Sequence, residues 1–505
     1  MTSGADVVAA NGGRARPGAT TDGALVAIAT ISSIGLLPWL NKSLWEDEGA
    51  SLYAAHLSWR GLWQQSRVVD LVLLPYYAVL HVWVQVSGGI GWIRFLSILA
   101  FGLTVFVTGR LGNRLGGRWC AVVAAVLTAT NPLMVEAALD ARPYALAALA
   151  ASVSVTALIR WFDSARARWM WVFSLCALAA LLLQMFAVLV PVSALVVLLL
   201  IEPHRWREQS RRLLPPLTVL TVAAVAFGVV ASGQSSQIAW ITPLQNKGLI
   251  IALLGPEYAI GEHAYAVVAL GIVALVAAAA LVVCVRAWRG GRRPTRPELG
   301  LFVLTAAWAA IPTAVLIAFS LVKPVYTSRY VTPSAPGLAL VVGLLVAHSM
   351  RIVDLRWRTR SLTVIGAGVG VATLVVATLA VPAAGSVIDD LQGAAQFLAV
   401  HVRGAGDVAI TDHAMTAAID YYFQKDHAKV AAWPQLPDQR YISGFDLEQN
   451  AATVSRAPAT VWLVDNSGIA GTGQFIALLR RHGYARAGTR NFVGCSVVRF
   501  YRRTT

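Results

Sequence analysis

Apolar runs of about 20 residues recur along most of this 505-residue chain, and they constrain its fold more than any other feature. Runs of this length predict helices that cross a membrane, because about 20 helical residues span the hydrocarbon core of a bilayer. Hydrophobic residues make up 57% of the chain and charged residues only 13%, roughly half the charged fraction of an average soluble protein. This composition argues against the alternative of a large soluble helical protein.

The hydropathy pattern predicts eleven membrane-spanning helices. Their ranges are 24–40, 92–110, 118–133, 143–161, 169–184, 186–202, 214–233, 264–286, 299–321, 332–349 and 362–383. The tight pair 169–184 and 186–202 has an alternative, a single merged span. Merging would invert the topology of everything downstream and place basic loops outside, so the charge pattern favours two separate helices.

The formal net charge of +16 would suggest a nucleic-acid partner in a soluble protein. Here the basic residues lie in short loops between predicted spans, so membrane orientation explains them and no nucleic acid is expected. Alternate loops are rich in arginine: Arg110, Arg114 and Arg118; Arg160, Arg166 and Arg168; Arg205, Arg207, Arg211 and Arg212; Arg286, Arg289, Arg292, Arg293 and Arg296; Arg351, Arg356, Arg358 and Arg360.

The positive-inside rule places these arginine-rich loops and the N-terminus in the cytoplasm. The loops 41–91, 134–142, 234–263 and 322–331 then face outward, as does the C-terminus after an odd number of spans. The bias towards Arg, Ala, Gly and Val also indicates a GC-rich bacterial genome. We therefore expect a multi-pass protein of the cytoplasmic (inner) membrane.

Three regions are predicted: a disordered cytoplasmic tail over 1–22, a helical transmembrane domain over 23–383 and a small α/β extracytoplasmic domain over 384–505. In the last region predicted strands alternate with helices, which favours an α/β arrangement. A turn leading into a strand is predicted at 406–411, further strands at 460–464 and 495–501, and helices at 414–423 and 473–482. Loop 41–91 of the transmembrane domain is predicted to hold amphipathic helices in the membrane interface.

The first motif with chemical potential is Glu46-Asp47-Glu48, at a predicted outer membrane edge. Adjacent carboxylates repel one another and are costly near lipid, so they indicate a general base or a cation site. On a helix the three side chains point in different directions, so at most one or two face a common cavity. The structural alternative is that these acids complement the dipole of a helix that follows them.

Two cationic motifs lie on the same predicted face of the membrane. Arg142 stands just ahead of Pro143, which suits the first turn of a helix, and its planar fork suits a phosphate. The other motif holds two cations and two tyrosines: Lys323, Tyr326, Arg329 and Tyr330. The structural alternatives are a local pair between Asp140 and Arg142, and anchoring of the second motif in the membrane interface. The shared face is the arrangement expected for chemistry on a lipid-linked phosphate.

The order of these motifs resembles that of the bacterial family 39-type glycosyltransferases. These are GT-C membrane enzymes, relatives of the protein O-mannosyltransferases and of the aminoarabinose transferase that acts on lipid A. The similarity covers about residues 25–350, and it is specific in the order and topology of the motifs rather than in any single one. The motifs are Trp45-Glu46-Asp47-Glu48-Gly49, Pro75-Tyr76-Tyr77 through His81-Val82-Trp83, Trp92-Ile93-Arg94-Phe95-Leu96-Ser97, Ala141-Arg142-Pro143-Tyr144-Ala145-Leu146 and Ser328-Arg329-Tyr330.

The resemblance implies a GT-C-like fold and an inverting transfer of a sugar from a polyprenyl-phosphate donor to an acceptor hydroxyl. It implies that Asp47 is the base, with Glu48 adjacent. It places Arg142 and Arg329 near the donor phosphate. Lys323 and Tyr330, which belong to the same motif as Arg329, are further candidates for binding this phosphate. Further residues would line or support the cavity or the acceptor: Asp70, Tyr76, Tyr77 and His81.

No metal site is assigned, and a divalent cation is left open as a cofactor. Many relatives carry a histidine shortly before the tyrosine pair, where this chain has Leu73-Leu74-Pro75. His56 and His81 are too scattered for a zinc site. The four cysteines, Cys120, Cys176, Cys284 and Cys495, show no disulfide framework or zinc motif.

A lipid or sugar transporter without catalysis is the competing interpretation. The many spans, the charges at membrane edges and an outer vestibule favour it. The predicted C-terminal domain, the lack of sequence repeats and the scarcity of charges inside the spans argue against it. The sequence names neither the sugar nor the acceptor, which could be a glycan, a glycolipid or a protein; membrane lipids are expected partners.

Overall fold

The structure is a computed structural model. It describes residues 19–234 except 68 and 202, 241, 243–244, 264–290, 295–352, 389–402, 407–427 except 412, 454–465 and 472–502. The chain divides into two compact units: residues 1–40 with 94–385, and residues 41–93 with 386–505. Residues 1–18 of the predicted tail and the predicted span 362–383 lie outside the described residues.

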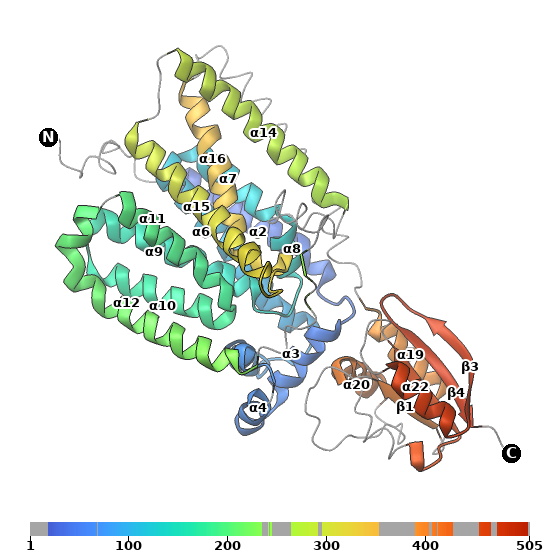
Figure 1. Ribbon diagram of the computed structural model, residues 1–505. Helices are drawn as coiled ribbons and strands as arrows, with labels where there is room; N and C mark the ends of the chain where they lie inside the picture. Colours follow the sequence, from blue (N-terminus) through green and yellow to red (C-terminus); the bar gives the residue numbers. More distant parts are fainter. Residues whose placement is uncertain are drawn as a thin grey trace. The chain divides into compact units, whose positions relative to one another are not determined.

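The first unit is built from helices (Figure 1). They are α2 (Ala19–Leu36), η1 (Leu37–Trp39), α6 (Ile90–Gly116, whose first residues belong to the second unit), α7 (Arg118–Ala129), α8 (Pro132–Ala138), α9 (Tyr144–Ser164), α10 (Ala167–Leu183), η3 (Met185–Val188), α11 (Leu189–Ile201), α12 (Pro203–Ser232), α14 (Ala264–Arg289), α15 (Arg296–Ser320), η6 (Ser328–Ser334) and α16 (Ala335–Ile352). Every predicted span except the last overlaps these helices. Four of them extend over two consecutive elements: 24–40 over α2 and η1, 118–133 over α7 and α8, 186–202 over η3 and α11, and 332–349 over η6 and α16.

Among the described residues, five helices are long and apolar enough to cross a membrane, or six if the bent pair α7–α8 forms one span. Shorter apolar helices accompany them, including α10 and the stretch Met185–Ile201. The tight pair predicted at 169–184 and 186–202 is indeed two helices, because the backbone at Gln184 is extended, with φ −150° and ψ 111°. The prediction of a helical, multi-pass membrane protein is therefore confirmed.

Small residues allow α6, α7 and α16 to pack closely. A Cβ atom on Gly112 of α6 would lie 2.9 Å from the carbonyl oxygen of Cys120 on α7, and one on Gly343 of α16 would lie 3.0 Å from the same oxygen. Close approach through glycine is typical of membrane helices, whose association depends on van der Waals contact rather than on the hydrophobic effect. These contacts give the bundle a tightly packed centre.

A tryptophan on α15 fixes the 3₁₀ helix η6. Trp308 is fully buried, and its indole N–H donates to the carbonyl of Pro333 at 2.8 Å. A Cβ on Gly337 would lie 2.7 Å from Cγ of Trp308, so α16 begins directly against the indole. The segment that carries Arg329 is therefore held by a buried hydrogen bond and by close packing.

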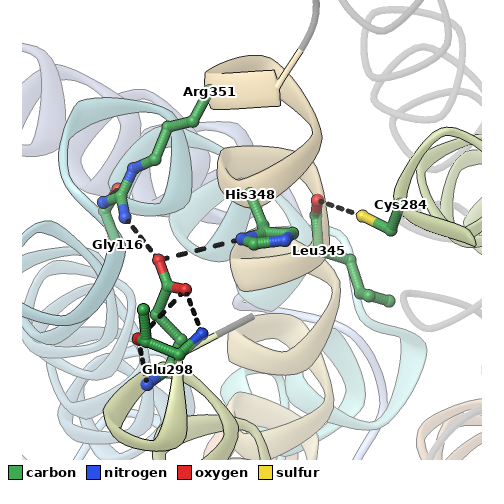
Figure 2. Close-up of polar contacts among 7 residues, drawn as sticks. Gly116, Cys284, Glu298, Leu345, His348 and Arg351 are labelled. Carbon is green, nitrogen blue, oxygen red and sulfur yellow. Dashed lines mark hydrogen bonds and ion pairs between the residues drawn. The ribbon is translucent and has the colours of Figure 1, made fainter. Parts of the chain in front are cut away.

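Charged side chains join the start of α15 to the end of α16 and to α6 (Figure 2). Oε1 of Glu298 lies 3.2 Å from Nη1 of Arg351 and 3.8 Å from Nδ1 of His348. Nη2 of Arg351 also donates to the carbonyl of Gly116 at 3.2 Å. Glu298 additionally caps α15, since its Oε2 accepts from the backbone N–H of Thr295 at 3.0 Å.

We expect Glu298→Ala to destabilise the protein by about 1–2 kcal/mol, because it removes both a helix cap and an ion pair. Glu298→Gln should cost less, since glutamine also completes a capping box but carries no charge. Thermal unfolding of both variants in detergent would measure the difference. Equal losses for the two variants would show that the cap contributes nothing.

The second unit contains a four-stranded mixed sheet in its C-terminal part (Figure 1). The strands are β1 (Asp407–Thr411), β2 (Thr460–Asp465), β3 (Tyr484–Asn491) and β4 (Ser496–Arg502), and the helices are α19 (Leu391–His401), α20 (His413–His427) and α22 (Thr472–Arg481). The order is β1-β2-β4-β3; β1 and β2 are parallel and the other pairs are antiparallel.

Strand β2 supplies the core on both faces of the sheet. Val461 and Leu463 pack in one cluster with Phe475 of α22. Trp462 points to the other face because side chains alternate along a strand, and its ring lies 5.9 Å from that of Phe397 on α19. The predicted strands and helices of this region are all present, whereas β3 and α19 were not predicted.

The side chain of Cys495, which precedes β4, is buried. Burial, with the nearby Asp389 and Asp390 carboxylates, raises the pKa of this thiol from 9.0 to about 12. The unfolded chain loses the proton near pH 9 and the folded chain only near pH 12. The contribution of this group to stability is therefore present below pH 9 and is lost as the pH rises towards 12.

At pH 8 we expect iodoacetamide to modify Cys495 in the folded protein about 1,000-fold more slowly than in denatured protein, because the thiolate is the nucleophile. Peptide mapping by mass spectrometry would follow the reaction. Equal rates in the folded and denatured protein would contradict the burial of this thiol.

Candidate active site

The three adjacent acids form the first turn of α3 (Glu46–His56), in the second unit. Glu48 is fully buried, and its Oε2 accepts from the backbone N–H of Trp45 at 3.5 Å, so this carboxylate caps its own helix. Asp47 is only half-buried. All three acids lie in the first turn, where a negative charge stabilises the helix dipole, so the structural alternative remains open for each of them. Of the predicted base and the acid adjacent to it, Asp47 is the more exposed.

Helix α5 (Leu74–Trp83) supports α3 from within the same unit. Nδ1 of His81 donates to the carbonyl of Ala55 at 3.0 Å, which ties the two helices together. The His81 ring also packs edge-on against Trp59 of α4 (Trp59–Ser66), with centroids 4.4 Å apart. His81 thus supports the acid-bearing helix.

A turn with unusual backbone geometry precedes α5. Asp70 has φ +59° and ψ 30°, a left-handed conformation that is uncommon for residues other than glycine. The hydroxyl of Tyr77 donates to Oδ2 of Asp70 at 2.9 Å and holds the turn. Tyr76 and Tyr77 are both buried. The structure therefore brings Asp70 and Tyr77 together, two of the predicted supporting residues.

The predicted phosphate-binding residues lie in the first unit. Arg142, which is 8% exposed, stands just before α9, and Arg329 and Tyr330 belong to η6. The rings of Tyr144 and Tyr330 lie 6.4 Å apart, so the segments carrying the two arginines pack against each other. Lys323 lies on an exposed stretch after α15.

Arg94 and Ser97 of α6 each bond to the backbone of another segment of the first unit. Arg94 is fully buried, and its Nη1 donates to the carbonyl of Leu40 at 2.8 Å. The hydroxyl of Ser97 donates to the carbonyl of Asp140 at 2.7 Å and so fixes the turn before Arg142. Neither residue was predicted to support the site, although both belong to the Trp92–Ser97 motif. The sequence signal that could have indicated Arg94 is an arginine inside the predicted apolar span 92–110.

In the described part of the chain, no group of three or more His, Cys, Asp or Glu side chains is arranged so that it could hold a metal ion. Both histidines of the 41–93 segment have backbone partners instead. His56 contacts the carbonyl of Leu52 at 2.8 Å, and His81 contacts that of Ala55.

Comparison with known proteins gives a family-model match over part of the chain and a shared fold over most of it. Residues 76–232 match the family model described as dolichyl-phosphate-mannose-protein mannosyltransferase. The crystal structure of ArnT from Cupriavidus metallidurans bound to undecaprenyl phosphate superposes with a TM-score of 0.57 and 13% identity, covering 94% of this chain and 98% of that one. The apo structure of the same protein gives a TM-score of 0.53 and 14% identity, with the same coverage.

No curated protein sequence matches the chain significantly. The similarity to known proteins consists of the family-model match over residues 76–232 and of a fold shared over nearly the whole length. The chain therefore has the GT-C-like fold of ArnT, and its residues 76–232 resemble the mannosyltransferase family.

Proposed function

We propose that this protein is an inverting glycosyltransferase that moves a sugar from a polyprenyl-phosphate donor to an acceptor hydroxyl. The observation that carries this proposal is the fold shared over 94% of the chain with an ArnT structure that holds undecaprenyl phosphate. Two further observations support it. Asp47 on α3 is partly exposed, and the segments that carry Arg142 and Arg329 pack against each other.

Asp47 is the proposed general base. It takes the proton from the acceptor hydroxyl as that oxygen attacks the anomeric carbon of the sugar. A new glycosidic C–O bond forms, and the C–O bond to the lipid phosphate breaks on the opposite side, so the configuration at the anomeric carbon inverts. Buried Glu48 serves this step by capping the helix that carries Asp47.

The departing lipid phosphate carries the negative charge that develops in this step. Arg142 and Arg329 are proposed to bind it, with Tyr330 and Lys323 assisting. Arginine suits this role because its planar fork can pair with two phosphate oxygens at once. Such pairing stabilises the transition state more strongly in a site that excludes water than in bulk solvent.

The proposed orientation follows from the charge of the loops. The N-terminus lies in the cytoplasm, and the reaction and the C-terminal region lie on the outer face of the cytoplasmic membrane. The polyprenyl tail lies among membrane lipids, in a lateral groove between helices. The acceptor is a glycan, a glycolipid or a protein.

The test uses the full-length protein in lipid nanodiscs with undecaprenyl phosphates that carry radiolabelled mannose, arabinose or galactose. Crude envelope fractions supply the acceptor. Transfer of label to an acceptor, with an inverted anomeric configuration in the product, is the expected result. Movement of intact labelled donor across proteoliposome membranes, with no new glycosidic bond from any donor, would overturn the proposal in favour of a transporter.

A further inference from the structure

The chain just before Asp47 is attached to the C-terminal part of the second unit. The backbone N–H of Leu44 donates to the hydroxyl of Tyr422, on α20, at 2.7 Å, and both residues are 2% exposed. One residue earlier, the hydroxyl of Ser43 accepts from the backbone N–H of Gln392, at the start of α19, at 3.2 Å. Two helices of the C-terminal part thus hold the entry to α3.

The chain just after Asp47 is attached to the same helix. A Cβ atom on Gly49 would lie 2.9 Å from Cβ of Ala418 and 3.0 Å from its backbone nitrogen. A neighbour that consists of backbone cannot move aside as the end of a flexible side chain can. Helix α20 therefore packs directly on the first turn of α3, at a distance that only glycine permits.

Asp47 lies between these two attachments, in the first turn of its helix. The first turn is the part of a helix with the fewest internal hydrogen bonds, so its direction depends on outside contacts. A base must be held to within a fraction of an ångström of its working position, since displacements of about 1 Å cost as much as 100-fold in rate. The contacts from α20 supply that restraint at both ends of the turn.

We infer that α20 is a positioning element for the transfer reaction, and that Tyr422 and Ala418 are positioning residues for Asp47. This inference rests on the proposed function, because it assigns a purpose to a contact beside the proposed base. Tyr422 satisfies the buried N–H of Leu44, and Ala418 limits the position of Gly49. Neither residue is assigned contact with a substrate.

The first experiment compares Tyr422→Phe with Tyr484→Phe. Each substitution removes one buried phenol hydroxyl from the second unit. The hydroxyl of Tyr484 donates to the carbonyl of Pro458 at 2.6 Å, between residues that both lie outside α3 and α20. Tyr484→Phe therefore controls for a loss of stability in the C-terminal part that leaves the base in place.

We expect Tyr422→Phe to lower kcat about 10- to 100-fold while the KM for the polyprenyl-phosphate sugar changes less than twofold. Amide hydrogen exchange of Trp45–Leu52 should become faster in this variant, whereas exchange in α5 stays unchanged. Tyr484→Phe should lower the unfolding temperature without changing kcat or the exchange of α3. Equal kcat losses for both variants, or a loss for Tyr422→Phe without faster exchange in α3, would overturn the inference.

A second pair of variants tests the contact at the other end of the turn. Gly49→Ala should lower kcat in the same manner, and Ala418→Gly in the same chain should restore part of it by making room for the new methyl group. A wild-type protein that transfers no sugar would defeat the proposed function itself. A wild type that transfers sugar, with Gly49→Ala and Tyr422→Phe equally active, would defeat only the positioning role.

Discussion

We expect Asp47→Asn to lower the rate of sugar transfer at saturating donor by about 100- to 10,000-fold, the range that removal of a general base produces. Asparagine has nearly the same shape as aspartate but cannot accept the proton of the acceptor hydroxyl. Binding of the donor should survive, because the phosphate is assigned to other residues. The measurement is transfer of radiolabelled sugar in nanodiscs, alongside equilibrium binding of the donor.

Glu46→Gln is the matched control for this variant. Glu46 is half-buried in the same first turn of α3, so its substitution makes the same change in charge against the same helix dipole. If the acids served only the helix, the two variants would lose stability equally and neither would lose turnover selectively. Equal transfer by wild type and Asp47→Asn would show that another carboxylate is the base.

The second large effect is expected at the donor phosphate. Arg329→Gln should weaken binding of undecaprenyl phosphate about 10- to 100-fold, because a hydrogen bond to a charged group is worth about 1.5–3 kcal/mol. Arg329→Lys should recover only part of the affinity, since an ammonium lacks the planar fork. Titration of a fluorescent polyprenyl phosphate into protein in nanodiscs would measure the dissociation constants.

Two further variants complete this test. Arg142 is buried. Arg142→Lys keeps the positive charge but removes the planar fork, so we expect a loss of affinity similar to that of Arg329→Lys. Arg296→Gln is the control. Arg296 is an exposed arginine at the first residue of α15, whereas η6, which carries Arg329, comes after the last residue of that helix. If Arg296→Gln weakened binding as much as Arg329→Gln, the effect would be one of net charge rather than of a site.

The candidate site shows how far a sequence pattern reaches. Three adjacent acids at a membrane edge indicated chemistry, and the resemblance selected Asp47. Only the structure shows that Glu48 is turned inwards as a helix cap while Asp47 stays accessible, since side-chain direction depends on the neighbours that a helix packs against. The hydrogen bond by which Ser97 fixes the turn before Arg142 likewise joins residues far apart in the chain.

The C-terminal region shows the same limit in its elements. Strand β2 was predictable because Val461, Trp462 and Leu463 form a compact apolar run. Strand β3 was not, because most of its side chains are exposed and polar, and it is a strand by virtue of its pairing with β4. Helix α19 is short and follows directly on the apolar region, so its pattern merges with that of the last predicted span.

The sequence by itself determined the helical membrane-spanning character of this protein, because about 20 apolar residues in a row have one stable arrangement in a bilayer, whatever their neighbours. It also determined the order of the motifs. The tertiary structure alone decided that residues 41–93 fold into one unit with residues 386–505. That association depends on the fit of Gly49 against Ala418 and of Leu44 against Tyr422, contacts across hundreds of residues that no local pattern encodes.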